Sequence, residues 1–472
     1  MSFLSPSLRC NWNLSSSEEA SISTSVFVGM LLGAPVWGYI DDMYGRRKGY
    51  IYSVVGTLVC GLCSTFSTGL AMLLIFRGGV GFCVSGSHVA MTMLSEFLPK
   101  SYRAVGIMCV GMLWSVGAIL EAFLAWIIMP NIKDTDMNWR VLLVVSSAPL
   151  LLLLFLSPHV PESPRWDVEN GNMESATRTL SKAALINGTS LPPGKLVKSK
   201  KKDNSNHEKT SRTAWRLLRL SEFQRLLALW CCVCVVYYGV VLLSTGMSSL
   251  ENTGDRCPSF NGRGSNDTDT TSSTCSGTYC SYCSRISRKQ STSNTGTLTT
   301  SDYRDAFVDS IAELPGLFVM IFFLDIYGRR RTIMVASLIC SVFFFALLPC
   351  LNREFEQSAL FLARMLIAGI FQCIFVYTPE LFPTNIRATA LGMCSSFARI
   401  GGMSTPIFAV VLLDANDSIA LLCYAVFCIL SGVLMFSLPF ETLGAPMGVA
   451  FKRLLGEKKS GGGYSDLERV DN

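Results

Sequence analysis

Long apolar runs separated by short polar connections dominate the chain. Eleven of these runs approach the roughly 20 residues that a helix needs to cross about 30 Å of hydrocarbon. They lie at 21–40, 50–66, 70–94, 104–128, 141–157, 226–247, 304–324, 332–350, 357–377, 389–413 and 417–438. A segment in hydrocarbon must satisfy its own backbone hydrogen bonds, and an α-helix does so. The pattern therefore predicts an all-α membrane protein with eleven visible spans.

Composition agrees with that prediction and defines the expected partner. Hydrophobic residues make up 50% of the 472 positions and charged residues 16%, which is too apolar for water-soluble domains of this length. The net charge of +6 is spread between the apolar runs, so the lipid bilayer is the expected partner and nucleic acid is not. The 18 cysteines mostly stand singly inside apolar runs, where cysteine behaves as a small hydrophobe. Their spacing predicts no metal site.

The connections between the spans give an orientation. Lysine and arginine gather in the short connections on one side, among them Arg46, Arg47 and Arg329. Short connections rich in these residues stay in the cytoplasm. This side is therefore expected to be cytoplasmic, with residues 1–20 on the outside.

Two sequence motifs recur, which indicates an internal duplication. DMYGRR at 42–47 returns as DIYGRR at 325–330, and EFLPKSYRA at 96–104 returns as ELFPTNIRA at 380–388. Repeats with the same polarity predict two six-span units. The span at 226–247 has no counterpart in the first unit, so we expect that the first helix of the N-terminal half is missing. A protein that naturally has eleven spans is the alternative.

The repeat also divides the chain into regions. We expect an N-terminal bundle of five visible spans at 1–157, a basic cytoplasmic linker at 158–225, a C-terminal bundle of six spans at 226–438 and a cytoplasmic tail at 439–472. The lysine-rich part of the linker suits a position near anionic lipid headgroups.

A long outer loop, 248–303, interrupts the C-terminal bundle. It is rich in Ser, Thr and Gly, a composition typical of flexible segments. Four cysteines in it can pair in three ways in an oxidising compartment: Cys257, Cys275, Cys280 and Cys283. Asn266 begins an Asn-Asp-Thr acceptor for glycosylation on the same loop.

The first repeated motif contains residues suited to a conformational latch. Gly38 lets two helices approach closely, and Gly45 permits a tight turn. Asp42 can accept hydrogen bonds or cap a helix end, whereas Arg46 and Arg47 can clamp a carboxylate or a lipid phosphate. Charge pairs of this kind can form in one state of a protein and break in another.

The same groups recur in the second copy and in two glutamate–arginine pairs. They are Asp325, Gly328, Arg329 and Arg330, Glu96 with Arg103, and Glu380 with Arg387. We interpret the whole set as conformational latches between the halves that favour the outward-open state. The alternative is simple anchoring of the spans by positive charge on the cytoplasmic side.

These motifs resemble a known family. GYIDDMYGRRKG at 38–49 resembles the signature loop of the major facilitator superfamily, and its second copy stands at the matching place. PESPRW at 161–166 and the two E-x-x-P-x-x-x-R motifs resemble the branch of sugar porters, organic-ion transporters and synaptic vesicle proteins. LSPSLRCNW, YYG at 237–239 and YTPELFPTNIRATALG are most similar to the synaptic vesicle glycoprotein-related group. The resemblance implies the major facilitator fold of two six-helix pseudo-repeats. Ile321 departs from it, since it replaces the glycine seen at Gly38.

Charged residues inside the spans are candidates for substrate binding or coupling, because each is costly at mid-membrane unless it is paired or faces water. Arg77 and Glu121 lie at matching depths in neighbouring spans, and we predict that they pair, for structure or for gating of the substrate. Arg364 has the corresponding depth in the second half. Arg399 lies deep without an evident partner in sequence, and an anionic substrate group can meet it.

An acidic ladder enters the membrane in the second half. Asp305, Asp309 and Glu313 recur every four residues, so they share one helix face. We expect Asp305 and Asp309 to be solvated at the mouth. Glu313 is expected either to neutralise Arg364 or to carry a coupling proton. A proton or another cation is the expected coupling ion.

Aromatic and amide side chains within the spans are candidate liners of a cavity. They are Trp114, Tyr237, Tyr238, Gln372 and Tyr377. Packing between helices is the commoner use of such residues and is the alternative.

Two functions fit the sequence. We favour a secondary transporter of a small organic solute, either an organic ion or a sugar-like molecule, that works by alternating access around a midplane site. The alternative is a non-transporting protein of vesicles or the plasma membrane that acts as a constituent or receptor. The sequence has no hydrolytic triad, metal motif or dinucleotide fingerprint. We therefore expect neither an enzyme nor a bound cofactor.

Overall fold

The computed structural model of the chain is helical. It describes residues 3–98, 103–132, 135–194, 196, 218–253, 300–349, 353–382, 387–438 and 441–442. Within these ranges the chain forms helices and connecting turns and contains no strand. The prediction of an all-α protein is confirmed for this part of the chain.

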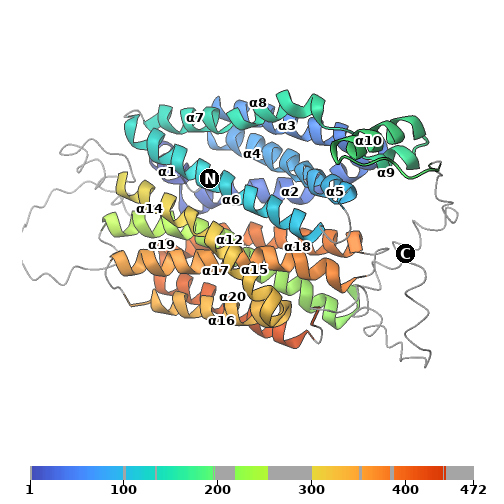
Figure 1. Ribbon diagram of the computed structural model, residues 1–472. Coiled ribbons are helices and arrows are strands. Elements are labelled where there is room, and N and C mark those ends of the chain that lie inside the picture. Colours follow the sequence, from blue (N-terminus) through green and yellow to red (C-terminus); the bar gives the residue numbers. More distant parts are fainter. Residues whose placement is uncertain are drawn as a thin grey trace, which may run out of the picture.

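Two bundles of helices lie side by side (Figure 1). The first, drawn in blue to green, contains α1 (Ser5–Asn11), α2 (Ser16–Tyr44), α3 (Arg46–Thr65), α4 (Leu70–Val84), α5 (His88–Phe97), α6 (Arg103–Asn131), α7 (Thr135–Ser146) and α8 (Ala148–Leu156). The second, drawn in lime to red, contains α12 (Ser221–Thr253), α14 (Thr300–Ile311), α15 (Glu313–Tyr327), α16 (Arg329–Ala346), α17 (Arg353–Leu381), α18 (Arg387–Pro406), the π-helix η4 (Ile407–Leu412), α19 (Leu413–Ala415) and α20 (Asp417–Ser437).

Each predicted span overlies one helix or a series of consecutive helices. Nine of these segments in the described chain are long and apolar enough to cross a membrane. The predicted spans at 50–66 and 332–350 coincide with α3 and α16, whose first turns carry the basic residues of the signature loop and are therefore less apolar. Both helices still pack inside their bundles, α3 against α4 and α16 against α20.

Local sequence explains where α2 begins and ends. The Ser15 side chain accepts a hydrogen bond from the backbone N–H of Glu18, and the Glu18 carboxylate accepts one from the backbone N–H of Ser15 at 2.8 Å. This reciprocal capping satisfies two donors at the helix start. α2 ends at Gly45, whose φ of 105° favours glycine, and α15 ends in the same way at Gly328 with φ 88°. The two copies of the motif therefore form the same turn between helices.

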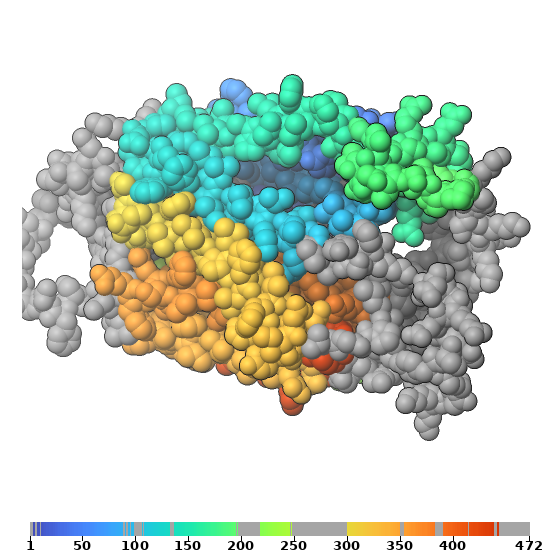
Figure 2. All heavy atoms as spheres, viewed as in Figure 1, coloured from blue at the N-terminus to red at the C-terminus, as the bar shows by residue number. Residues whose placement is uncertain are grey.

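α12 forms the centre of the second bundle. It packs against α17, α18 and α20, and 78% of its apolar stretch is buried. By the sequence repeat, the counterparts of those neighbours in the first bundle are α4–α5, α6 and α7–α8. In the described part of the first bundle no helix takes the place of α12, and the surface between α6 and α7–α8 is hollowed (Figure 2). A further helix before residue 1 stays a prediction.

The two bundles meet near their outer ends. Phe123 of α6 packs against Phe307 of α14 with ring centroids 5.7 Å apart, and Thr24 of α2 donates a hydrogen bond to the carbonyl of Met403 on α18 at 3.3 Å. Towards the predicted cytoplasmic end, α2 exposes large side chains such as Tyr39, which is 65% exposed. With the predicted orientation, the contacts between α6 and α14 and between α2 and α18 close the outer side between the two halves.

The predicted linker and outer loop are described only in part. Two short helices of the linker, α9 (Pro164–Glu169) and α10 (Met173–Ile186), pack against each other. Asn266 and the four loop cysteines Cys257, Cys275, Cys280 and Cys283 lie outside the described residues. Glycosylation, disulfide pairing and the boundaries of the regions stay predictions.

Candidate functional site

A buried ion pair lies in the second bundle where α15 faces α17. Arg364 Nη2 donates to Glu313 Oε1 at 2.9 Å, and Arg364 Nε donates to the same oxygen at 3.2 Å. Glu313 is 1% exposed and Arg364 is 4% exposed. The expectation that Glu313 neutralises Arg364 agrees with this geometry.

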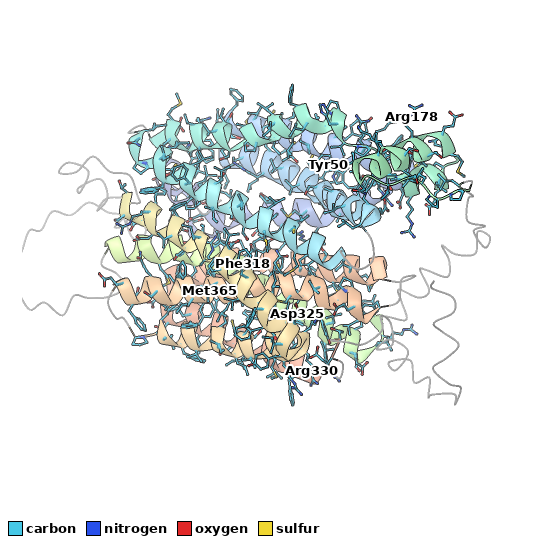
Figure 3. All side chains as sticks on the ribbon, viewed as in Figure 1. Tyr50, Arg178, Phe318, Asp325, Arg330 and Met365 are labelled. Carbon is cyan, nitrogen blue, oxygen red and sulfur yellow. The ribbon has the colours of Figure 1, made fainter. Side chains whose placement is uncertain are left out.

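Glycines bring α15 and α17 close enough for the pair to form. A Cβ at Gly316, three residues after Glu313, would collide with the backbone carbonyl of Met365, which lies beside α15 in Figure 3. A Cβ at Gly369 would collide with the side chain of Met320. Because both positions lack a side chain, the helix backbones approach closely and the charged groups reach hydrogen-bonding distance.

A chain of hydrogen bonds links the ion pair to the first bundle. The Tyr237 hydroxyl of α12 donates to Glu313 Oε2 at 3.4 Å. The Trp114 indole N–H of α6 donates to the Tyr237 oxygen at 3.0 Å. Trp114 is 48% exposed, so the chain runs from an accessible indole to a buried carboxylate. It crosses from one half of the molecule to the other.

Arg399 of α18 forms a second polar contact between the halves. Its Nη1 donates to the Tyr238 hydroxyl of α12 at 3.3 Å and to the Met30 sulfur of α2 at 3.4 Å. Tyr238 also packs edge-on against Phe27 of α2, with ring centroids 4.8 Å apart. The partners of Arg399 that were not evident in sequence therefore come from two distant helices.

Gln372 of α17 faces α6. It is 8% exposed, and a Cβ at Gly111 of α6 would lie against its amide group. We call the following set the central polar cluster: Trp114, Tyr237, Tyr238, Glu313, Arg364, Gln372 and Arg399. The cluster joins side chains of α6, α12, α15, α17 and α18, so both halves contribute to it.

Tyr377 does not belong to this cluster. It is fully buried and lies in the hydrophobic core of the second bundle. This burial agrees with the alternative of packing between helices, and the role of Tyr377 as a cavity liner stays a prediction.

In the first bundle, Arg77 of α4 and Glu121 of α6 interact electrostatically. The Arg77 Nε is buried and has no hydrogen-bond partner among the described residues. No hydrogen bond or salt bridge joins the two side chains among the described contacts, so their pairing stays a prediction.

The acidic ladder is buried. Asp305 is 6% exposed and Asp309 is 5% exposed, so the prediction that both are solvated is wrong. The physical reason is that α14 packs against α6 of the first half, and the meeting of the two halves covers this face. Asp305 also pairs with Arg304, whose Nη2 lies 3.0 Å from Asp305 Oδ1.

A charge network surrounds the signature loop of the first half. Arg46 Nη1 lies 2.7 Å from Asp42 Oδ1, and Arg46 Nη2 lies 4.0 Å from Glu96 Oε1. Glu162 Oε1 accepts the backbone N–H of Arg47 at 3.1 Å. Since the first N–H groups of a helix lack partners inside it, a carboxylate there satisfies donors and favours the helix dipole. Acidic residues thus fix the start of α3.

The second half repeats this network. Arg329 Nη1 lies 3.5 Å from Asp325 Oδ1, and Arg329 Nε lies 3.4 Å from Glu380 Oε2. Glu441 accepts the backbone N–H groups of Arg329 at 2.8 Å and Arg330 at 3.1 Å. The two networks match residue by residue, as the sequence repeat requires.

Sequence reasoning missed Glu162 and Glu441. A sequence pattern could have identified the two glutamates, because PES at 161–163 and PFET at 439–442 each follow the last span of a half. A Cβ at Gly45 or Gly328 would collide with the carboxyl group of the corresponding glutamate. Each glycine therefore permits both the turn and the approach of the carboxylate.

The described contacts of both networks join elements of the same half. Arg103 begins α6 and Arg387 begins α18, but their side chains lie outside the described part of the chain. A latch that joins the two halves stays a prediction.

Gly38 does not mediate a close approach in this structure. A Cβ at Gly38 would meet no described atom within 4 Å. The close approach of α2 occurs at Gly29 and Gly33, where a Cβ would collide with the backbone of Gly78 and Phe82 of α4.

The central polar cluster suits a small polar molecule better than a metal ion. Within the described residues, no group of three or more His, Cys, Asp or Glu side chains is placed to hold a metal. The cluster instead offers one carboxylate, two guanidinium groups, an amide and three aromatic side chains. These groups can bind an organic ion or a polyol by charge, hydrogen bonds and aromatic contact.

The chain matches known transporter families over most of its length. Residues 2–249 match the sugar (and other) transporter family, and residues 303–456 match the Major Facilitator Superfamily. The chain is 35% identical over 467 residues to a synaptic vesicle 2-related protein of Xenopus laevis, which covers 99% of this chain and 79% of that protein. It is 32% identical over 478 residues to the organic cation/carnitine transporter 7 of Arabidopsis thaliana, with 94% and 88% covered.

Solved structures share the fold. The inward open conformation of the xylose transporter XylE from E. coli superimposes with a TM-score of 0.64 at 15% identity, and the match covers 96% of this chain and 95% of that one. The human organic anion transporter MFSD10 gives a TM-score of 0.55 at 14% identity, with 88% and 83% covered. The predicted fold and family are both confirmed. The chain is a multi-pass integral membrane protein that belongs to the major facilitator superfamily, in the group of synaptic vesicle 2-related proteins.

Proposed function

We propose that this protein is a secondary transporter that moves a small organic solute across a vesicle or plasma membrane by alternating access. The hydrogen-bond chain from Trp114 through Tyr237 to Glu313 carries the proposal, because it joins the two halves at a buried ion pair. A group that both halves contact is where binding can be coupled to their relative motion. The central polar cluster is the proposed binding site.

Glu313 is the proposed coupling group of this site. When Glu313 binds a proton it becomes neutral, and the buried guanidinium of Arg364 loses its counter-ion. A buried charge without a partner is costly, so an anionic group of the solute takes the place of the carboxylate. The solute is therefore proposed to be an organic ion with a carboxylate or a similar acidic group.

The names of related proteins support this solute class. One relative is named as an organic cation/carnitine transporter and one protein of the same fold as an organic anion transporter, and carnitine carries both a quaternary ammonium and a carboxylate. A sugar-like solute is the second choice, because the cluster also offers uncharged hydrogen-bonding groups and another protein of the same fold is named as a xylose transporter.

Uptake by the purified full chain in liposomes tests the proposal. Labelled carnitine, succinate and xylose are added outside while the outside is made acidic, and accumulation is followed over time. We expect accumulation of carnitine or succinate that depends on the proton gradient. We expect Glu313→Gln to abolish this pH dependence, because the glutamine cannot take up the proton.

Two further variants make the result specific. Trp114→Phe keeps an aromatic ring at this position but removes the indole N–H that donates to Tyr237. Transport should therefore slow while folding is retained. Trp12→Phe, which changes a tryptophan packed against Trp139 at the outer end of the first half, is the matched control and should transport normally. Binding of a solute without flux would instead favour the non-transporting alternative.

A further inference from the structure

Acidic side chains line one face of α14 from its outer end to the central polar cluster. Asp302 is 3% exposed, Asp305 6% and Asp309 5%, and Glu313 follows with 1%. Successive members of the series Asp305, Asp309 and Glu313 are four residues apart, which corresponds to a rise of about 6 Å for each step along a helix. The face therefore provides carboxylates at regular intervals between the outer side and the ion pair with Arg364.

Asp309 is the member of this series without a partner. Its side chain makes no hydrogen bond or ion pair with any described residue, although the residue is 95% buried and the carboxyl group interacts electrostatically with Arg364 and Asp305. The described hydrogen bonds of the Arg364 guanidinium, from Nε and Nη2, go to Glu313 and not to Asp309. A buried carboxyl group without a partner is expensive in its ionised form and is stabilised by taking up a proton.

The neighbours of α14 define which charges face this position. α14 packs against α6, α12, α15 and α17. In the described part of the chain, the titratable or charged groups that these helices and α14 bring to this region are Glu121, Tyr237, Asp302, Tyr303, Arg304, Asp305, Glu313, Glu356 and Arg364. Acidic groups outnumber basic ones, and no three of the acidic groups are placed to hold a metal ion. A proton therefore suits this region better than a metal.

We infer that Asp309 is a proton-binding site that passes protons between the outer side and Glu313. The inference rests on the proposed function, in which Glu313 is the coupling group. The path follows the acidic face of α14 and meets the central polar cluster at Glu313, the first residue of α15. It is covered in this structure by α6 and becomes accessible when the outer ends of the halves separate.

The proton transfer proceeds in two steps. A proton from outside water first binds to a carboxylate oxygen of Asp309, with Asp305 as the preceding acceptor nearer the outer end. The proton then moves, directly or through one water molecule, to a carboxylate oxygen of Glu313. Asp309 returns to its ionised form, Glu313 becomes a neutral acid, and Arg364 keeps its charge and loses its counter-ion.

Infrared difference spectroscopy tests the site without any solute. The full chain is reconstituted in liposomes, the outer pH is lowered, and the C=O stretch of protonated buried carboxyl groups is recorded. We expect Asp309→Asn to remove one component of this band and Asp309→Glu to restore it at a shifted frequency. Asp417→Asn, a change at the outer start of α20, should leave the band unchanged. An unchanged band in Asp309→Asn would overturn the inference.

Proton-driven uptake provides the second measurement. In Asp309→Asn, we expect external acid to lose its stimulation of carnitine or succinate uptake, whereas exchange at equal pH continues. If uptake in this variant keeps the pH dependence of the wild type, the proton site is wrong and the transport function stands. If the wild type moves none of the solutes and the Asp309 component of the band is present, the transport function is wrong and the proton site stands.

Discussion

Glu313 and Arg364 place two charges where their burial is expensive. Removal of an ion from water costs several kcal/mol, and the attraction between the two charges repays this cost only when hydrogen bonds satisfy the remaining groups. Here Arg364 donates twice to one oxygen of Glu313, and Tyr237 donates to the other. An apolar pair would fill the same space at no such cost, which indicates that the charges serve function.

The pair should respond asymmetrically to substitution. Arg364→Gln leaves the Glu313 carboxylate buried without its cation, and we expect a loss of about 3–5 kcal/mol of unfolding free energy. The double variant Glu313→Gln/Arg364→Gln removes both charges and should lose clearly less. Thermal unfolding in detergent measures both effects. Arg178→Gln, at an exposed residue of the linker helix α10, is the control and should change stability by less than about 1 kcal/mol. Equal losses in the single and double variants would contradict the argument.

At the scale of helices, small residues decide where α2 packs. Gly29 and Gly33 face α4 so closely that a side chain at either would collide with the backbone of α4. Gly38 lies further along the same helix and meets no described atom. The closest approach of α2 to α4 is therefore at Gly29 and Gly33, whereas Gly38 lies on a face of α2 that meets no described atom within 4 Å.

This difference gives a matched pair of variants. Gly33→Ala forces a methyl group into the contact with Phe82, and we expect overpacking to cost about 1–3 kcal/mol of unfolding free energy. Gly38→Ala should be neutral or stabilise by up to about 1 kcal/mol, because alanine favours a helix more than glycine does. Thermal unfolding of the two variants decides the point. A loss in Gly38→Ala as large as that in Gly33→Ala would show that this end of α2 is packed after all.

The spans, the repeat and the turns at Gly45 and Gly328 could be predicted from the sequence, because each depends on the length of an apolar run or on a local motif. The burial of Asp309 could not, since it arises only when α14 of one half meets α6 of the other. The partners of Arg399 were hidden for the same reason, because Met30 lies 369 positions away in sequence. Local sequence patterns therefore predict the helices and turns. The burial and the partners of the charged residues depend on contacts between the two halves.

At the scale of the whole molecule, the closed outer side is a contact between helices of different halves. Ala122 and Ala125 of α6 and Ala306 of α14 belong to one buried cluster, in which Ala122 and Ala125 are fully covered and Ala306 is 5% exposed. Small side chains let α6 and α14 lie against each other. Alternating access requires this contact to separate while the cytoplasmic ends close.

A wedge at the outer contact should shift the balance of states. Ala306→Trp introduces a large side chain between α14 and α6, and overpacking of about 1–3 kcal/mol raises the population of the separated state about tenfold for each 1.4 kcal/mol. We expect faster hydrogen–deuterium exchange in residues 120–131 and 300–311, measured by mass spectrometry, together with loss of solute uptake. Gly38→Trp is the control, because Gly38 lies on the predicted cytoplasmic side, where a Cβ meets no described atom within 4 Å, and this variant should leave exchange at the outer ends unchanged. If Ala306→Trp left exchange in both outer segments at the wild-type rate, the contact between α6 and α14 would not be the gate, because a gate must open when its packing is disrupted.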